Sequence, residues 1–183
     1  MVTLTSVDPV RSQVPAQPRS KDDPSLVLSG VMPGAYVARV MPMGSGYVSS
    51  LRCGDADLLR DMLIVPANGQ VPAIEIVVRN DGGSINVHVR SDKPVESGRI
   101  LLIPEFAPNL PPSIVYINPG IDTEYGGLAP GNYKVFAFDA IEGIEYGNPD
   151  AMAKYADKAG TVTITAKGRS SVSVDLIRMG DVN

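Results

Sequence analysis

The chain has only one cysteine, one histidine and no tryptophan among its 183 residues. A lone cysteine, Cys53, cannot form a disulfide within the chain, and a lone histidine cannot build a multi-histidine metal site. Disulfide scaffolds and zinc chemistry are therefore excluded. The glycine-rich loops that hold phosphates and the calcium-loop pattern D-x-[DN]-x-[DN]-G are also missing from the sequence. The sequence accordingly predicts no cofactor and no metal.

Basic charge and long apolar runs are scarce as well. Sixteen Lys and Arg residues stand against twenty Asp and Glu residues, for a net charge of −4, which lacks the positive footprint of a nucleic-acid binder. The longest apolar runs, such as Met62–Pro66 and Ile100–Pro104, fall far short of the roughly 18 residues of a spanning helix. We therefore expect no membrane insertion. Because no secretory signal is visible at the N-terminus, the chain reads as cytoplasmic, or as a fragment or mature form of something longer.

Short strands dominate what is present. Eighteen glycines and sixteen prolines are spread between Val- and Ile-rich runs, as turns are in an all-β chain. Alternation of apolar and polar residues is cleanest in Ser84–Arg90, Thr161–Thr165 and Ser171–Leu176. Further strands, about eleven in all, are predicted at Val2–Val7, Ser25–Leu28, Ala35–Val40, Tyr47–Leu51, Ile74–Arg79, Arg99–Ile103, Ser113–Ile117 and Tyr133–Phe138.

One or two short helices complete the prediction. Asn148 is a suitable cap for a helix of about two to three turns that starts at Pro149 and ends before Gly160. A second helix is predicted over Asp55–Met62. Residues 8–24, rich in Pro, Ser, Gln and Asp, are interpreted as a long or partly disordered loop.

An internal repeat predicts two domains. The segment around Pro33 recurs 97 residues later around Pro130, as P-G-A-Y and then P-G-N-Y. The boundary is expected at the turn-forming cluster Asn80–Gly83. The predicted domains are residues 1–81 and residues 82–183.

The repeated motif predicts a structural corner. Proline presets φ, the next glycine tolerates the positive φ of a type II turn, and the tyrosine begins the next strand. The pattern resembles the tyrosine corner of sandwich domains, in which the hydroxyl bonds a backbone group upstream. The residues assigned to this structural role are Pro33, Gly34, Tyr36, Pro130, Gly131 and Tyr133.

The two copies are unequal. The second copy opens with a strong strand at Ser84–Arg90, whereas the first begins at Val2–Val7, which already matches the following strand of the second copy. The first domain is therefore predicted to lack its first strand. A neighbouring domain or chain, or the 8–24 segment, would then supply the missing edge by strand addition.

The same residues resemble a known family. Val31–Tyr36 and Leu128–Ala137 are similar to the L-x-P-G-x-Y core of carboxypeptidase regulatory-like domains, and Gly82–Val89 with Pro94–Leu102 is similar to the first two strands of that family. The similarity covers residues 83–183 well and residues 25–81 moderately. The chain departs from the family pattern in two places. The first strand usually has a glycine where this chain has Asn86, and the Asp-x-x-Gly turn that usually precedes the P-G-x-Y segment is reduced to Asp122–Tyr125.

The resemblance implies a fold and a kind of function. The family consists of transthyretin-like β-sandwiches often strung in tandem in large bacterial secreted or surface proteins. It implies two tandem Ig-like or transthyretin-like β-sandwiches that act as a non-catalytic structural or interaction module, located outside the cell or on its surface. It carries over no catalytic residue.

Residues with chemical potential are few. His88 lies between Val87 and Val89 on a strand, which indicates a solvent-facing residue and not a catalytic base. The acidic pairs Asp55/Asp57 and Glu142/Glu145 indicate solvated loop charge, with weak calcium binding left open.

Two alternatives to the structural role remain. The first is a carbohydrate-binding module that uses Tyr116, Tyr125 and Tyr146 as stacking rings, provided that they gather on one exposed face. The second is a subunit that assembles by β-strand exchange.

Overall fold

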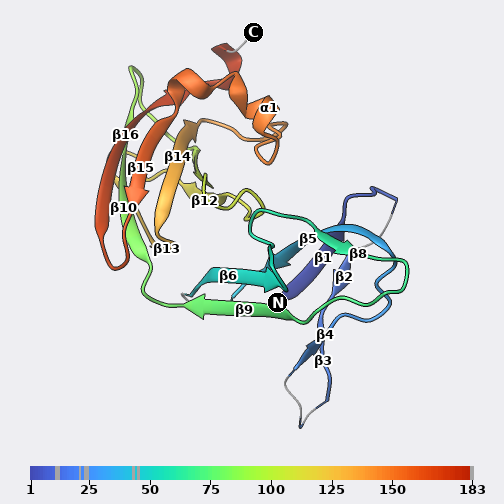
Figure 1. Cartoon of the computed structure of the whole chain (residues 1–183). Coiled ribbons are helices and arrows are strands. Elements are labelled where there is room, and N and C mark those ends of the chain that lie inside the picture. The colour runs from blue at the N-terminus through green and yellow to red at the C-terminus, as the bar shows by residue number, and fades with distance from the viewer. Residues whose placement is uncertain (11–12, 21, 23–24, 43, 45, 182–183) are drawn as a thin grey trace. The chain divides into compact units, whose positions relative to one another are not determined.

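The computed structural model of the chain describes residues 1–10, 13–20, 22, 25–42, 44 and 46–181 (Figure 1). The protein is mostly β-sheet, which confirms the all-β prediction. Of the predicted 8–24 loop, residues 11, 12, 21, 23 and 24 lie outside the described residues. Among the described residues, no helix has the length and apolar character needed to cross a membrane.

The chain divides into two compact units. Unit 1 comprises Met1–Asn80 together with Ala107–Leu110, and unit 2 comprises Asp81–Phe106 and Pro111–Asn183. The inclusion of Ala107–Leu110 in unit 1 differs from the two continuous domains that the sequence predicts. Its physical reason is Asn109, whose side-chain amide donates to the carbonyl oxygens of Leu58 and Asp61 at 3.1 and 2.9 Å.

The described strands of unit 1 form three small sheets. The first has the order β2-β1-β5-β8, the second β7-β6-β9, and β3 pairs with β4. The strands are β1 (Val2–Ser6), β2 (Val14–Pro15), β3 (Gln17–Pro18), β4 (Leu26–Val27), β5 (Gly34–Val40), β6 (Tyr47–Cys53), β7 (Ala56–Asp57), β8 (Leu63–Val65) and β9 (Ile74–Arg79). Its buried apolar side chains include Val2, Leu4, Tyr36, Ala38, Val48, Leu51, Leu58 and Leu63.

Unit 2 is built on one larger sheet. Its strand order is β12-β11-β14-β16-β10-β13, and β15 pairs with β14 beside this path. The elements are β10 (Gly83–Arg90), β11 (Arg99–Pro104), β12 (Ser113–Tyr116), β13 (Thr123–Leu128), β14 (Gly131–Phe138), α1 (Pro149–Ala153), η1 (Ala156–Lys158), β15 (Gly160–Ile164), β16 (Arg169–Ile177) and η2 (Met179–Asp181). Strand β16 runs parallel to β10 along most of its length and to β14 at Leu176 and Ile177, so it joins the two halves of the sheet.

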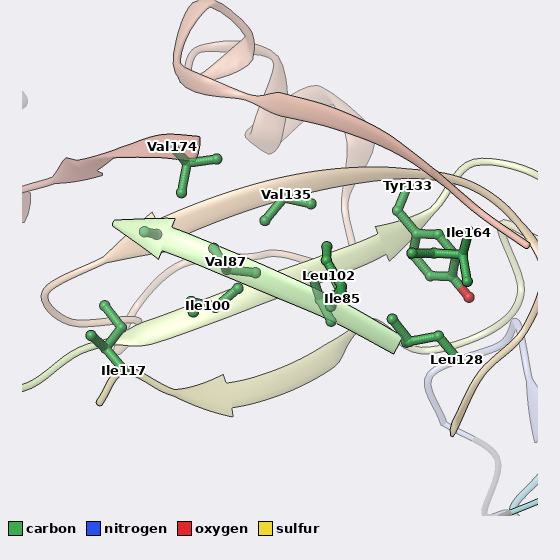
Figure 2. Close-up of a cluster of buried hydrophobic side chains, with 11 residues drawn as sticks. Ile85, Val87, Ile100, Leu102, Ile117, Leu128, Tyr133, Val135, Ile164 and Val174 are labelled. Atoms are coloured by element: carbon green, nitrogen blue, oxygen red, sulfur yellow. The ribbon is translucent and has the colours of Figure 1, made fainter. Parts of the chain in front are cut away.

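Two apolar layers cover opposite sides of β11 and β14. One layer is the cluster that Figure 2 shows, with Ile85 and Val87 of β10 against Ile100, Leu102 and Val135. The other layer contains the side chains that point the opposite way along β11 and β14, and the segment around α1 covers them. Its buried members are Leu101, Phe136, Phe138, Ile144, Met152, Tyr155 and Ile177. Strands buried on both faces have continuous apolar sequences, as Ile100–Leu102 does.

The helix predictions are partly corrected. Asn148 caps α1 as predicted, because its Oδ1 accepts from the backbone N–H of Asp150 at 3.0 Å. The α-helix is shorter than predicted, since it ends at Ala153 and gives way to the separate η1 turn. The helix predicted over Asp55–Met62 is wrong. Residues 56–57 form β7, and Asp57 Oδ1 then accepts from the N–H of Leu59, which sets a turn.

A three-strand frame recurs in the two units. In unit 1, β5 pairs antiparallel with β1 and β8; in unit 2, β14 pairs antiparallel with β11 and β15. Tyr36 lies opposite Leu63 in the first frame, as Tyr133 lies opposite Val162 in the second. The internal repeat is therefore a repeat of pairing and register as well as of sequence.

Candidate functional site

The repeated tyrosines occupy the same position in each frame. Tyr36 Oη donates to the carbonyl oxygen of Met32 at 2.8 Å, and Tyr133 Oη donates to that of Ala129 at 2.9 Å. Both rings are buried. Pro33 and Pro130 directly follow the acceptor residues, so the chain turns between each hydroxyl and its partner. These tyrosines hold structure and are not available to a ligand.

The glycine of the motif has a different conformation from the predicted one. Gly34 and Gly131 have φ values of 152° and 150° and open β5 and β14 themselves, whereas the second central residue of a type II turn has φ near about 80°. The prediction of a type II turn is therefore wrong. The physical demand on glycine remains, because this mirror-β region is accessible essentially to glycine alone.

Gly131 meets a second constraint. A Cβ atom at this position would lie 2.5 Å from Cε1 of Phe106 and closer still to Cδ1. The Phe106 ring in turn packs edge-on against Tyr133, with 5.6 Å between ring centroids and 74° between ring planes. The glycine, the phenylalanine and the corner tyrosine thus form one packed unit.

The three tyrosines considered for ligand stacking are not gathered on one face. Tyr116 lies opposite Arg99 at the end of β12, and the Arg99 guanidinium stands 3.7 Å from the centroid of its exposed ring. Tyr146 packs against the layer that contains Phe138. Tyr125 belongs to β13 and lies opposite Ile85, whose side chain belongs to the other apolar layer. The structure therefore provides no three-ring platform.

A polar recess lies on β14 and β15. It has a volume of about 230 Å³ and is lined by Glu105, Asn132, Thr161, Val162 and Thr163. Within it, Thr163 Oγ1 donates to Asn132 Oδ1 at 2.7 Å. Sequence reasoning missed this recess, because Asn132 and Thr163 become neighbours only through the register of β14 against β15.

The carboxylate of the recess, that of Glu105, has a basic neighbour. Lys134 Nζ lies 3.6 Å from Glu105 Oε1. Lys134 of β14 lies opposite Thr161 of β15. This pair is two residues from the pair of Asn132 and Thr163, so both pairs lie on the same face of the sheet. The recess lining thus presents a carboxylate, an amide and two hydroxyls, and the Lys134 ammonium group lies beside the carboxylate.

A row of polar side chains runs from Asp122, the residue before β13, across β10 to β16. His88 Nδ1 lies 2.8 Å from Asp122 Oδ1, and Asn86 Nδ2 donates to Asp122 Oδ2 at 2.8 Å. The hydrogen bond with His88, and then that with Asn86, lowers the pKa of the Asp122 carboxyl. The His88 side chain is 58% exposed, in keeping with the predicted solvent-facing position.

Nucleophilic catalysis would also require a hydroxyl that is hydrogen-bonded to the His88 ring. A hydroxyl must reach the imidazole nitrogen that does not face the carboxylate. Ser173 lies opposite His88 in the β10–β16 pair, yet in the described part of the chain no hydrogen bond joins its hydroxyl to the ring. The exposed pair between Arg90 and Asp175, 2.8 Å apart, continues the row as surface charge.

The acidic pairs and the cysteine have local roles. Glu142 accepts from the N–H of Ile141, and Glu145 accepts from the side chain of Asn148. Among the described residues, no group of three or more His, Cys, Asp and Glu side chains could hold a metal ion. Cys53 is buried, its Sγ donates to the carbonyl oxygen of Pro72 at 3.3 Å, and burial raises the pKa of its thiol.

Known proteins offer no guide to these features. Comparisons with protein families, curated proteins and solved structures find no match. The repeated frame, the polar recess and the edges of the sheets are the features of this chain that bear on its function.

Proposed function

We propose that the chain is a non-catalytic module of two carboxypeptidase regulatory-like β-sandwich units, which serves as a structural or interaction segment of a bacterial secreted or cell-surface protein. The observation that carries the proposal is the repeated tyrosine corner. Tyr36 and Tyr133 each bond the carbonyl that precedes the proline of the motif, within the same three-strand frame. The extracellular location follows from the family likeness.

The distribution of chemical groups favours this function over catalysis. The sole histidine is paired with Asp122 on an exposed face, and the sole thiol is buried with a raised pKa, which suits a structural residue better than a nucleophile. The feature that the two units share is the frame, in which the rings of Tyr36 and Tyr133 are buried and their hydroxyls are hydrogen-bonded to the backbone.

Activity assays on the full chain test the non-catalytic half of the proposal. The chain is incubated with chromogenic esters, phosphoesters, glycosides and peptides, beside His88→Ala and the matched surface variant Arg90→Ala. We expect the three proteins to show the same background rate. A turnover that Arg90→Ala retains and His88→Ala abolishes would show that the chain is an enzyme.

A second candidate function is binding of a small polyhydroxylated ligand, such as a monosaccharide, in the polar recess. The observation in its favour is the lining, because threonine hydroxyls, an asparagine amide and a carboxylate exchange hydrogen bonds with sugar hydroxyls. No stacking ring is part of the recess lining. We therefore expect affinities no tighter than about millimolar.

An NMR titration with glucose, galactose and mannose tests the second candidate. Amide shifts should concentrate on β14 and β15, and Thr163→Val should remove them, because it deletes the hydroxyl that bonds Asn132. Ser173→Ala, on the opposite half of the sheet, is the matched control. Shifts that are absent, or that Thr163→Val leaves unchanged, exclude the recess as the binding site.

A further inference from the structure

Strand β9 forms one end of a sheet in unit 1. Within the part of the chain that the structure describes, β9 closes the order β7-β6-β9 and pairs only with β6. Regular edge strands attract other strands, and proteins protect them with prolines, irregular pairing or short length. Two other sheet ends have such protection: β8 has three residues and precedes Pro66, and β12 has four residues and follows Pro111 and Pro112. Strand β9 has six residues and no proline.

Each face of β9 presents one exposed valine. Val77 and Val78 are neighbours, so their side chains point to opposite faces of the strand. Both are about half exposed, at 50% and 49%. A partner strand along the edge would cover part of each.

One hydrogen bond shows which backbone groups face the open edge. Ser49 Oγ of β6 donates to the carbonyl oxygen of Val77 at 3.1 Å, so that carbonyl points toward β6. Consecutive residues of a strand direct their N–H and C=O groups to alternate edges. The backbone groups of Ile76 and Val78 therefore point away from β6.

The sequence of β9 is complementary to itself. In an antiparallel pair of two β9 strands centred on Val77, Ile76 lies opposite Val78 of the other copy, and Glu75 lies opposite Arg79. The first of these pairs brings together the residues whose N–H and C=O groups face the open edge, so both can form the two bonds of a hydrogen-bonded pair. The second places opposite charges across the ladder, which stabilises sheet pairs.

We propose that β9 is a homodimerisation edge, along which two copies of this chain pair antiparallel about a two-fold axis through Val77. An isologous interface of this kind requires a surface patch that matches itself, and β9 matches itself in charge, in hydrogen-bonding direction and in apolar surface. The internal repeat shows that a strand at this place can carry two partners, because β16, which follows the frame in unit 2 as β9 does in unit 1, pairs in parallel with β10 and with β14. The inference goes beyond the proposed function, since it needs the β9 edge and not the family likeness.

Charge reversal tests the proposal on the full chain by sedimentation equilibrium. We expect the wild-type chain to dimerise, and Glu75→Lys and Arg79→Glu each to weaken the dimer by about tenfold or more, because each puts like charges opposite one another twice. An equimolar mixture of the two single variants should form a heterodimer, since every charge pair is then opposite again. Both residues are exposed, so circular dichroism should show both variants folded.

Cysteine cross-linking is a second test of the register between the two β9 strands. Val77 would face its own counterpart in a non-hydrogen-bonded pair, with Cα atoms about 4.5 Å apart, which is within disulfide reach. Val77→Cys should cross-link on oxidation, and the matched variant Ile64→Cys, exposed on β8, should not.

Three results would overturn the proposal. The first is a wild-type chain that remains monomeric up to about 1 mM, the weak limit of specific association. The second is a dimer that both charge reversals leave intact, and the third is a mixture of the two variants that stays monomeric. The test of the β9 dimer is independent of the tests of sugar binding in the recess and of the non-catalytic role, so a failure of either proposal leaves the dimer proposal standing.

Discussion

Replacing Gly131 by alanine should destabilise unit 2 through two separable effects. The residue holds φ at 150°, a region that costs a non-glycine residue about 1–3 kcal/mol. The added methyl group also collides with the Phe106 ring, which must move away from Tyr133 or force β14 to shift, at a further cost of about 1–3 kcal/mol. Together these costs reach about 2–6 kcal/mol, a large part of the 5–15 kcal/mol by which a typical domain is stable.

Gly120→Ala is the matched control for backbone strain. Gly120 also has positive φ, at 76°, but a Cβ atom there would have nothing within 4 Å. It should therefore cost only about 1–2 kcal/mol, the penalty of the left-handed region. The excess loss in Gly131→Ala contains the collision with Phe106 and the difference in backbone strain between the two φ regions.

A double-mutant cycle isolates the collision. Phe106→Ala removes the ring, so the pair Phe106→Ala/Gly131→Ala should be less destabilised than the sum of the single variants by about 1–3 kcal/mol. Urea unfolding read by hydrogen exchange of β14 peptides assigns the loss to unit 2, since a chain of two units need not unfold in one step. An additive cycle, or a Gly131→Ala loss no larger than that of Gly120→Ala, would refute the collision between this position and the Phe106 ring.

Three further predictions concern side-chain hydrogen bonds. Tyr36→Phe and Tyr133→Phe should each cost about 0.5–1.5 kcal/mol in urea unfolding, because each leaves a carbonyl without its hydroxyl donor; a negligible loss in both would contradict the corner role. Asn148→Ala should cost about 1 kcal/mol and increase hydrogen exchange at the start of α1, and unchanged exchange would show that the cap is dispensable. The lowered pKa of Asp122 means that its contribution to stability is present above about pH 4, its unfolded value, and is lost as the pH falls through the folded pKa. At low salt, the free energy of unfolding should therefore fall less steeply with decreasing pH in Asp122→Asn than in the wild-type chain. The same acid dependence in both proteins would contradict a role of the Asp122 carboxylate in stability.

Strands with strong local patterns could be predicted from the sequence. Those at Ser84–Arg90 and Ile74–Arg79 form where the alternation or the β-branched run places them. Strand β13 was missed because Thr123–Leu128 contains two adjacent glycines and has little intrinsic strand preference. Its extended form depends on the ladder with β10, in which Thr123 lies opposite Val87. Pairing that is distant along the chain thus overrides the local signal.

The functional features also divide into those set by neighbouring residues and those set by pairing that is distant along the chain. The corner tyrosines could be found from sequence, because proline, glycine and tyrosine stand at fixed short spacing. The polar recess could not, because it needs Glu105 after β11 beside Asn132 of β14 and Thr163 of β15. The glycine conformation was also missed, since the spacing indicates that glycine is needed but not whether φ is 76°, as at Gly127, or 150°.

The segment between the second and third strands of the frame explains why the two units differ. In unit 2 it contains Asn148 and Pro149, a cap and a helix start, followed by Met152 and Tyr155 at helical spacing, and it covers the outer side of β11 and β14. In unit 1 it contains β6, whose buried Val48 and Leu51 face one way because a bulge at Ser49 resets the alternation.

A helical insertion covers a sheet face and offers no backbone groups to a strand, whereas a strand insertion must pair and so creates a new edge. Strand β6 takes β9 as its partner and leaves the other side of β9 as the end of that sheet. The same frame with two kinds of insertion therefore gives one unit a covered face and the other an edge able to associate. On this argument, replacing the β6 insertion should change association of the chain more than replacement of the α1 insertion does.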